Sequence, residues 1–118
     1  MESTQRPGNS ASISRTAFHV LVAIGPDERH GYGIMQEVAR ITNGATRLGP
    51  GGVYTTIRRL LDDKLIDESD QRPDPELDDQ RRRYYRLTGL GRSVVSAEIS
   101  RLESLVEAAR PWAHESAG

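Results

Sequence analysis

Apolar residues recur at helical spacing in the first periodic segment of the chain. They occupy positions i, i+4, i+7, i+8 and i+11, which are Ile13, Ala17, Val20, Leu21 and Ile24. Ser12 or Ser14 is suited to cap the start of this helix, and Gly25-Pro26 is suited to end it. Residues 1–11 are polar and aperiodic, so we expect a disordered tail there.

Two further helices show the same kind of pattern. One follows a polar turn at residues 27–30, covers about residues 31–42, and has an apolar face made of Ile34, Met35, Val38 and Ile41. The other begins near Pro50, since the missing N–H of proline would have no partner at a helix start. Its buried stripe is Val53, Ile57, Leu60 and Leu61.

The period then changes from helical to alternating. Residues 65–69 are compatible with a short strand, and the run 82–87 alternates so that Tyr85 and Leu87 share a face with Arg83. A polar loop at 70–80, with two prolines, separates the two runs. This pattern predicts a small β-hairpin, a wing, that needs helices beneath it to be stable.

A long amphipathic helix closes the pattern. Thr88 is a suitable N-cap, and we expect the helix to cover residues 89–110 and to end at Pro111. Its apolar residues follow the 4-3-4-3 spacing of a heptad seam, widened by Leu105: Val95, Ile99, Leu102, Leu105, Val106 and Ala109. At about 1.5 Å per residue this helix is roughly 33 Å long, more than a domain of this size can cover. We therefore expect a symmetric homodimer, the alternative being packing against the chain's own first helix.

The element order predicts a mostly α fold with a small β-hairpin wing, a winged helix-turn-helix DNA-binding domain with a C-terminal dimerisation helix. Its expected parts are the tail 1–11, the winged domain 12–88, the dimerisation helix 89–110 and a flexible tail 111–118. In this layout the third helix enters the major groove of DNA. The residues expected on its outer side are Tyr54, Thr55, Arg58 and Arg59.

Two features beside these side chains favour an anionic partner. Gly51 and Gly52 allow a phosphate to approach the backbone at the helix N-terminus. The wing carries Arg81, Arg82 and Arg83. Each has an alternative: the helix arginines could pair with Asp62 and Asp63, and the wing arginines with acidic residues of the loop. Those acidic residues lack the central glycine and terminal glutamate of a calcium loop, so no metal site is expected.

Composition excludes other classes of protein. The 118 residues carry a net charge of −1 and no cysteine, which excludes disulfides and thiolate metal sites. No apolar run is long enough to cross a membrane, and residues 1–8 lack the apolar stretch of a secretory signal, so we expect a cytoplasmic protein. The three histidines, His19, His30 and His114, fall on separate segments, so neither an enzyme nor a cofactor is indicated. His30 and Tyr32 open the second helix, where capping or phosphate contact is expected.

Four short motifs together resemble the PadR family of transcriptional regulators, over about residues 13–109. They are His30-Gly31-Tyr32-Gly33-Ile34, Gly49-Pro50-Gly51-Gly52-Val53-Tyr54 with Arg59-Leu60, Leu65-Ile66, and Arg83-Tyr84-Tyr85-Arg86-Leu87-Thr88 with Gly91. The resemblance implies a dimeric bacterial repressor that a small ligand often releases from DNA. It also implies DNA contacts from Tyr32 and Tyr54, supplemented by the wing arginines.

The single C-terminal helix is similar to that of the short branch of this family. Family members often have Ser or Thr where this chain has Gly52, so a backbone N–H would have to replace that side-chain contact to phosphate. Some short members bind flat aromatic compounds in the dimer interface through a tryptophan of the last helix. Here Trp112 lies beyond Pro111, past the expected helix end. It is a candidate ligand contact, the alternative being that it packs on the partner's first helix.

The leading hypothesis is thus a sequence-specific transcriptional regulator, a ligand-responsive dimeric repressor that binds a pseudo-palindromic double-stranded DNA operator. A small aromatic effector is a further expected partner. The alternative is a winged-helix protein-interaction module whose arginines face an acidic partner and which does not bind DNA. A small hydrolase is disfavoured because the histidines are scattered along the chain.

Overall fold

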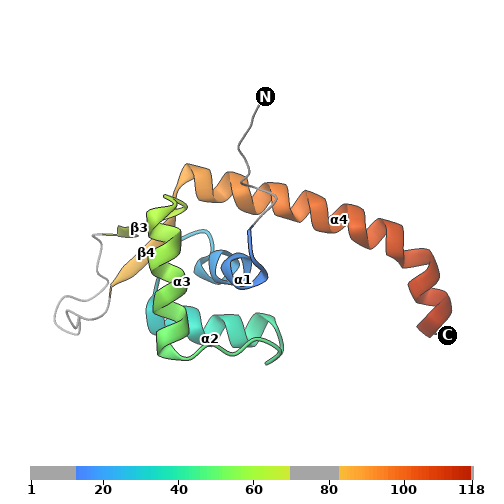
Figure 1. The fold of residues 1–118 in the computed structure, drawn as a ribbon, viewed down its shortest axis with the longest axis horizontal. Coiled ribbons are helices and arrows are strands. Elements are labelled where there is room, and N and C mark those ends of the chain that lie inside the picture. Colours follow the sequence, from blue (N-terminus) through green and yellow to red (C-terminus); the bar gives the residue numbers. More distant parts are fainter. Residues whose placement is uncertain (1–12, 70–82, 118) are drawn as a thin grey trace.

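The computed structural model describes residues 13–69 and 83–117, with side chains placed as far as Ala113. Its elements are, in chain order, α1 (Arg15–Ile24), β2 (Arg29–His30), α2 (Gly31–Ile41), α3 (Pro50–Asp62), β3 (Ile66–Ser69), β4 (Tyr84–Leu87) and α4 (Gly89–Ala117). The first three helices pack together with the strands at their side, and α4 extends beyond them as an arm (Figure 1). The expected tail 1–11, the wing loop 70–80 and the arginines at 81 and 82 lie outside the described residues.

The helix ends follow the capping chemistry of the sequence. The Ser14 hydroxyl caps α1 by accepting the Ala17 N–H at 3.0 Å, and Gly25 ends the helix at a φ of 78° that favours glycine. His30 caps α2, which ends at Thr42. Pro50 stands in the first turn of α3, where its missing N–H removes no helical bond. The predicted starts of these helices are confirmed.

The sheet has one strand more than the sequence predicts. Its antiparallel order is β2-β4-β3, with β3 and β4 forming the predicted hairpin. Arg29 and His30, expected in a polar turn, form β2 and pair with Tyr85 and Tyr84 of β4. Two residues are too few to show an alternating pattern, so only the pairing with β4 defines this strand.

The core lies between α1, α2, α3 and the inner face of the sheet. The expected inward residues of all three helices contribute to it. Alternation left open which face of β4 is inward, and the structure places Tyr85 on that face. The fully covered members are Leu21, Ile24, Ile34, Ile57, Leu60, Ile66, Val20, Val38 and Val53. Burying one such side chain stabilises a fold by about 1.5–3 kcal/mol, so this cluster holds the three helices and the wing as one unit.

The C-terminus of α3 and the N-terminus of α4 are joined by Thr88. Its hydroxyl donates to the Lys64 carbonyl at 2.7 Å and accepts the Gly91 N–H at 3.0 Å, and its own N–H donates to the Leu65 carbonyl at 3.0 Å. Gly91 packs so closely on Leu65 that a Cβ on it would collide with the Leu65 carbonyl oxygen. The start of α4 is therefore fixed to the turn that follows α3.

The expected end of the last helix is wrong. Pro111 lies inside α4, which continues to Ala117, so the helix includes residues predicted to form a flexible tail. A proline removes one backbone hydrogen bond and bends a helix, while the bonds on either side can maintain it. Figure 1 shows α4 bending near its C-terminal end. In the described ranges no helix has the length and apolarity needed to span a membrane.

Candidate nucleic-acid interface

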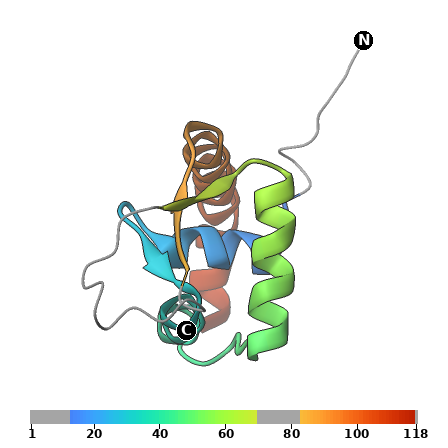
Figure 2. The same cartoon turned by 90° about the vertical axis from the view of Figure 1, so that its left-hand side faces the viewer.

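The outer side of α3 carries the side chains predicted to meet DNA. Tyr54, Thr55, Arg58 and Arg59 are exposed, while Val53, Ile57 and Leu60 anchor the opposite side in the core. Figure 2 shows α3 and the strands together on the face turned to the viewer, with α4 extending away behind them. The helix is thus held rigidly from behind with its outer side open.

The cations of α3 are available to a partner. Within residues 13–69 and 83–117, neither Arg58 nor Arg59 forms an ion pair or a hydrogen bond, so the alternative pairing with Asp62 and Asp63 does not occur there. Arginine presents a planar fork of donors that matches a phosphate or the edge of guanine. The two side chains can therefore reach a nucleic acid without first breaking a contact.

The start of α3 is open in the same direction. Its N-cap, Gly49, contributes no side-chain hydrogen bond, so among the described residues the first N–H groups of the helix have no side-chain cap. Gly51 and Gly52 are exposed, and a Cβ on Gly51 would meet nothing within 4 Å. A phosphate could approach these amides, which the helix dipole makes favourable for an anion.

The described cations of the wing are paired with carboxylates of β3. Arg83 donates to Glu68 at 3.1 Å and Arg86 donates to Asp67 at 2.9 Å, and all four side chains are about half exposed. The alternative considered from the sequence was pairing with carboxylates of the loop, which lies outside the described residues, whereas these two pairs come from the neighbouring strand. Arg81 and Arg82 lie outside the described residues. A partner that uses Arg83 has to compete with Glu68.

The N-terminus of α2 meets both α3 and the wing. Tyr32 points away from the core with 57% of its surface exposed. The His30 ring caps the helix and packs edge-on against Tyr84 of β4, with ring centroids 5.4 Å apart. Tyr54 is 43% exposed, but its hydroxyl lies directly over Gly31, so its polar end faces α2.

Tyr85 connects this junction to the core. Its pKa is raised, chiefly because burial disfavours the phenolate, with further contributions from the negative charge of Glu68 and from Tyr54, while Arg83 acts in the opposite direction. The phenol of Tyr85 therefore lies within electrostatic reach of the outer side of α3 and of the wing ion pair. The predicted wing, recognition helix and second helix converge here.

The predicted seam of α4 divides into two parts. Val95 packs on the core of its own domain, and Leu102 and Ala109 are half-buried. Ile99, Leu105 and Val106 are exposed, Leu105 at 52%, and Trp112 is 63% exposed. Trp112 stands seven residues after Leu105 and so continues its row along the helix. The expectation that Trp112 lies past the helix end is wrong, because α4 continues beyond it.

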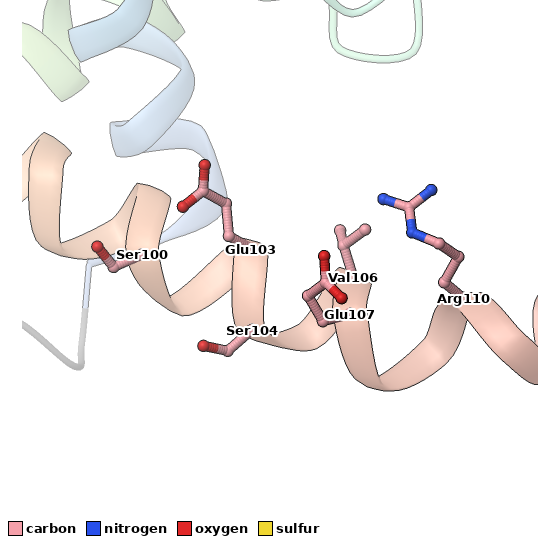
Figure 3. Close-up of a pocket in the computed structure, with 6 residues that line it drawn as sticks. All are labelled: Ser100, Glu103, Ser104, Val106, Glu107 and Arg110. Carbon is pink, nitrogen blue, oxygen red and sulfur yellow. The ribbon is translucent and has the colours of Figure 1, made fainter.

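Polar groups accompany the apolar positions of α4. Glu98 is almost covered and accepts two hydrogen bonds from Arg101, one of them 3.0 Å long, and this bonding lowers the pKa of its carboxyl. A shallow open groove follows the next turns of the helix (Figure 3). Its lining residues are Ser100, Glu103, Ser104, Val106, Glu107 and Arg110. Trp112 is not among them.

Sequence reasoning missed three contacts of this region. The ion pairs of Asp67 and Glu68 and the Tyr54–Gly31 contact join elements far apart in the chain, so no local pattern shows them. The strand at Arg29 is missed because it is so short. The close approach of Gly91 to Leu65 was also missed, although a glycine in the first turn of a helix is a sign that another segment packs closely there.

Comparison with known proteins identifies the family. Residues 20–97 match the family described as the transcriptional regulator PadR-like family. The chain belongs to this family. Its match to transcriptional regulator Rv3488 of Mycobacterium tuberculosis agrees, with 35% identity over 88 residues, 75% of this chain and 76% of that protein.

Solved structures show the same fold at lower identity. H. salinarum RosR has a TM-score of 0.68 and 18% identity, covering 92% of this chain and 97% of its own. A PadR family regulator of hypervirulent Clostridium difficile R20291 has a TM-score of 0.66 and 16% identity over 84% of this chain and 98% of its own. Bordetella bronchiseptica BpsR, whose DNA binding is regulated by 6-hydroxynicotinic acid, has a TM-score of 0.63 and 22% identity, covering 83% of this chain and 65% of its own.

The family settles the class of activity. This PadR-like chain is a transcriptional regulator of a DNA-binding family and not an enzyme, as the sequence predicts. The mostly helical winged fold is confirmed as well.

Proposed function

We propose that this PadR-like regulator is a dimeric repressor that reads a pseudo-palindromic double-stranded operator through α3. The observation that carries the proposal is the outer side of α3, where Arg58 and Arg59 are exposed and unpaired within the described residues, next to an open helix start at Gly51 and Gly52. Side chains at this position of a winged helix reach base edges in the major groove. Tyr32, Tyr54 and Thr55 add polar contacts around them.

The second part of the proposal is a homodimer formed through α4. The row Ile99, Leu105, Val106 and Trp112 exposes apolar surface on an arm that extends away from its own domain (Figure 1). A second copy of the same seam, with Val95, Leu102 and Ala109, would bury it in an isologous contact. Two copies of α3 would then face successive turns of one duplex, which supports a pseudo-palindromic site.

The third part is release by a small planar aromatic ligand. Trp112 is exposed on the same helix as the groove of Figure 3, two residues after its lining residue Arg110. The fold neighbour BpsR supports such regulation, since its DNA binding responds to an aromatic acid. Quenching of Trp112 fluorescence by planar aromatic compounds tests this part, and unchanged fluorescence at high micromolar concentrations would contradict it.

The experiment for DNA binding is fluorescence anisotropy with duplex from the upstream region of the chain's own gene, against a scrambled duplex. Arg58→Ala should weaken binding to the native duplex by about 1–3 kcal/mol if the side chain contacts a base. Arg15→Ala removes the same charge from the start of α1 and serves as the matched control. Equal and weak binding of both duplexes would contradict the proposal and favour a protein partner.

Oligomeric state is tested separately by light scattering after size-exclusion chromatography. Leu105→Asp places a charge in the middle of the exposed seam and should produce a folded monomer. Leu90→Asp is the control, because Leu90 is equally exposed at 54% but lies outside the seam. A Leu105→Asp variant that remains dimeric would contradict the proposed interface.

A further inference from the structure

His30 is an unusual helix cap. Its Nδ1 accepts the Gly33 N–H at 3.0 Å, in the place where Ser, Thr, Asp or Asn most often stands. A nitrogen that accepts a hydrogen bond needs its lone pair, so this contact requires Nδ1 to be unprotonated. The cap of α2 therefore depends on the protonation state of one ring.

The same residue connects α2 to the wing. His30 belongs to β2 and pairs with Tyr84 of β4, and the two rings meet edge-on at an interplanar angle of 86°. An aromatic contact of this kind adds to the packing of both rings. One side chain thus holds the first turn of α2 and a strand of the wing in a fixed relation.

The residue that follows connects this pair to α3. Gly31 is buried beneath the Tyr54 ring, and an ideally placed Cβ on it would lie 2.5 Å from the Tyr54 hydroxyl oxygen. A shift of the α2 start therefore displaces Tyr54. Tyr32, the next residue, projects outward on the same turn. The three candidate DNA-contacting elements meet at His30 and Gly31.

We propose that His30 is a positioning residue for DNA binding, which in its neutral form holds the start of α2, the wing strand β4 and Tyr54 of α3 in the arrangement that fits DNA. The proposal rests on the function proposed above. It assigns His30 no contact with DNA: the residue acts through Tyr32, Tyr54 and the wing.

Protonation of His30 would break the cap of α2. An imidazolium Nδ1–H would face the Gly33 N–H, donor against donor, and its positive charge would stand at a helix N-terminus, where the dipole disfavours a cation. The charged or titratable side chains described around the cap are Arg29 beside Gly33, Tyr84 on β4 and Tyr54 on α3, and Glu37 of α2 lies within electrostatic reach of Arg29. Arginine and tyrosine keep their charge state between about pH 5.8 and pH 8, where an ordinary histidine titrates.

Two substitutions separate the cap from the ring. His30→Asn keeps a side-chain oxygen that can accept the Gly33 N–H and removes the titration. His30→Phe keeps a ring against Tyr84 and removes the cap. His19 and His114 remain in both variants, so any difference in pH response from the wild type belongs to His30.

The test is operator affinity by anisotropy at about pH 8 and about pH 5.8, at constant salt, for the full-length wild type and both variants. Wild-type affinity should fall by about five-fold or more on acidification, and the affinity of His30→Asn should not. His30→Phe should bind about five-fold more weakly at both pH values, with an unchanged salt slope because no phosphate contact is lost. The protection factor of the Gly33 amide, which corrects for the slower intrinsic exchange at low pH, should be smaller in the wild type at about pH 5.8 than at about pH 8. In His30→Phe it should be small at both pH values.

The possible results discriminate between the two proposals. Wild-type affinity that rises on acidification would identify His30 as a cationic phosphate contact and overturn the positioning role. An equal fall in the wild type and in His30→Asn would assign the response to another group and overturn it too. Failure of the wild type to prefer the native duplex at about pH 8 would instead overturn the proposed function itself.

Discussion

The hydroxyl of Tyr54 on α3 rests directly on the Cα of Gly31 at the start of α2, with no room between them for a methyl group. This contact sets the direction of an exposed tyrosine on α3, and it exists only because residue 31 has no Cβ. Tyr54 is 43% exposed, and its hydroxyl end lies against the start of α2, so its orientation depends on the position of α2.

Gly31→Ala is the direct test of this contact. The new methyl group should displace the Tyr54 side chain, whose far end is free to rotate, so the free energy of unfolding should change by no more than about 1 kcal/mol. Operator affinity should fall, because Tyr54 leaves its place on α3. Urea denaturation and anisotropy measure the two effects, and Gly51→Ala, with open space at its Cβ, is the control for stability. Unchanged operator affinity in Gly31→Ala would show that the orientation of Tyr54 does not matter.

Gly91→Ala should behave differently, because its neighbour cannot rotate away. A methyl group there meets the backbone carbonyl of Leu65, which also accepts the Thr88 N–H. Overpacking against backbone costs about 1–3 kcal/mol of stability, and we expect the free energy of unfolding of Gly91→Ala to fall by an amount in the upper part of that range. Gly89→Ala, two residues earlier in the same helix with nothing near its Cβ, should lose no stability. Equal stabilities of the two variants in urea denaturation would be inconsistent with the close approach of α4 to Leu65.

The wing ion pairs predict a gain of function. Glu68→Gln should release Arg83 for a phosphate and raise operator affinity several-fold. The slope of log affinity against log salt concentration should become steeper by about one, for one added phosphate contact. The pair is about half exposed, so the free energy of unfolding should change by less than about 1 kcal/mol. Glu103→Gln removes the same charge from α4 and is the matched control. Weaker operator binding by Glu68→Gln than by the wild type would mean that the ion pair orders the wing for binding.

Burial of Tyr85 predicts a loss of stability at alkaline pH. Its pKa is raised in the folded state, mainly by burial, so the unfolded chain loses the phenol proton first. The stability associated with the neutral phenol is complete below about pH 10 and decreases as pH rises above that value. Urea denaturation at pH values on either side of 10 measures the slope of the free energy of unfolding against pH. Tyr85→Phe should have a shallower slope, and an identical one would show that Tyr85 is not the group responsible.

Some features of the candidate site depend on residues close together in the chain, and others depend on contacts between distant segments. The outer residues of α3 were predictable, since helical periodicity places Arg58 and Arg59 opposite Val53 and Ile57. The partners of Arg83 and Arg86 were not, because Asp67 and Glu68 are brought to them by strand pairing across a long loop. The extent of α4 was mispredicted at Pro111, since a proline signals a missing hydrogen bond but not whether the surrounding bonds continue the helix.

The elements that depend on neighbours along the chain could be predicted from the amino-acid sequence. A serine cap at residue 12 or 14, the start of α3 at Pro50, the shared face of Tyr85 and Leu87 and the apolar row on α4 all follow from residue type and spacing, because helices and strands have fixed periods. The contacts between separate elements are seen only in the folded chain: β2 with β4, Tyr54 with Gly31, Gly91 with Leu65, and the ring of His30 with Tyr84. Such contacts depend on how separate elements pack, and the periodicity of residues within one element does not show which atoms of another element will lie against it.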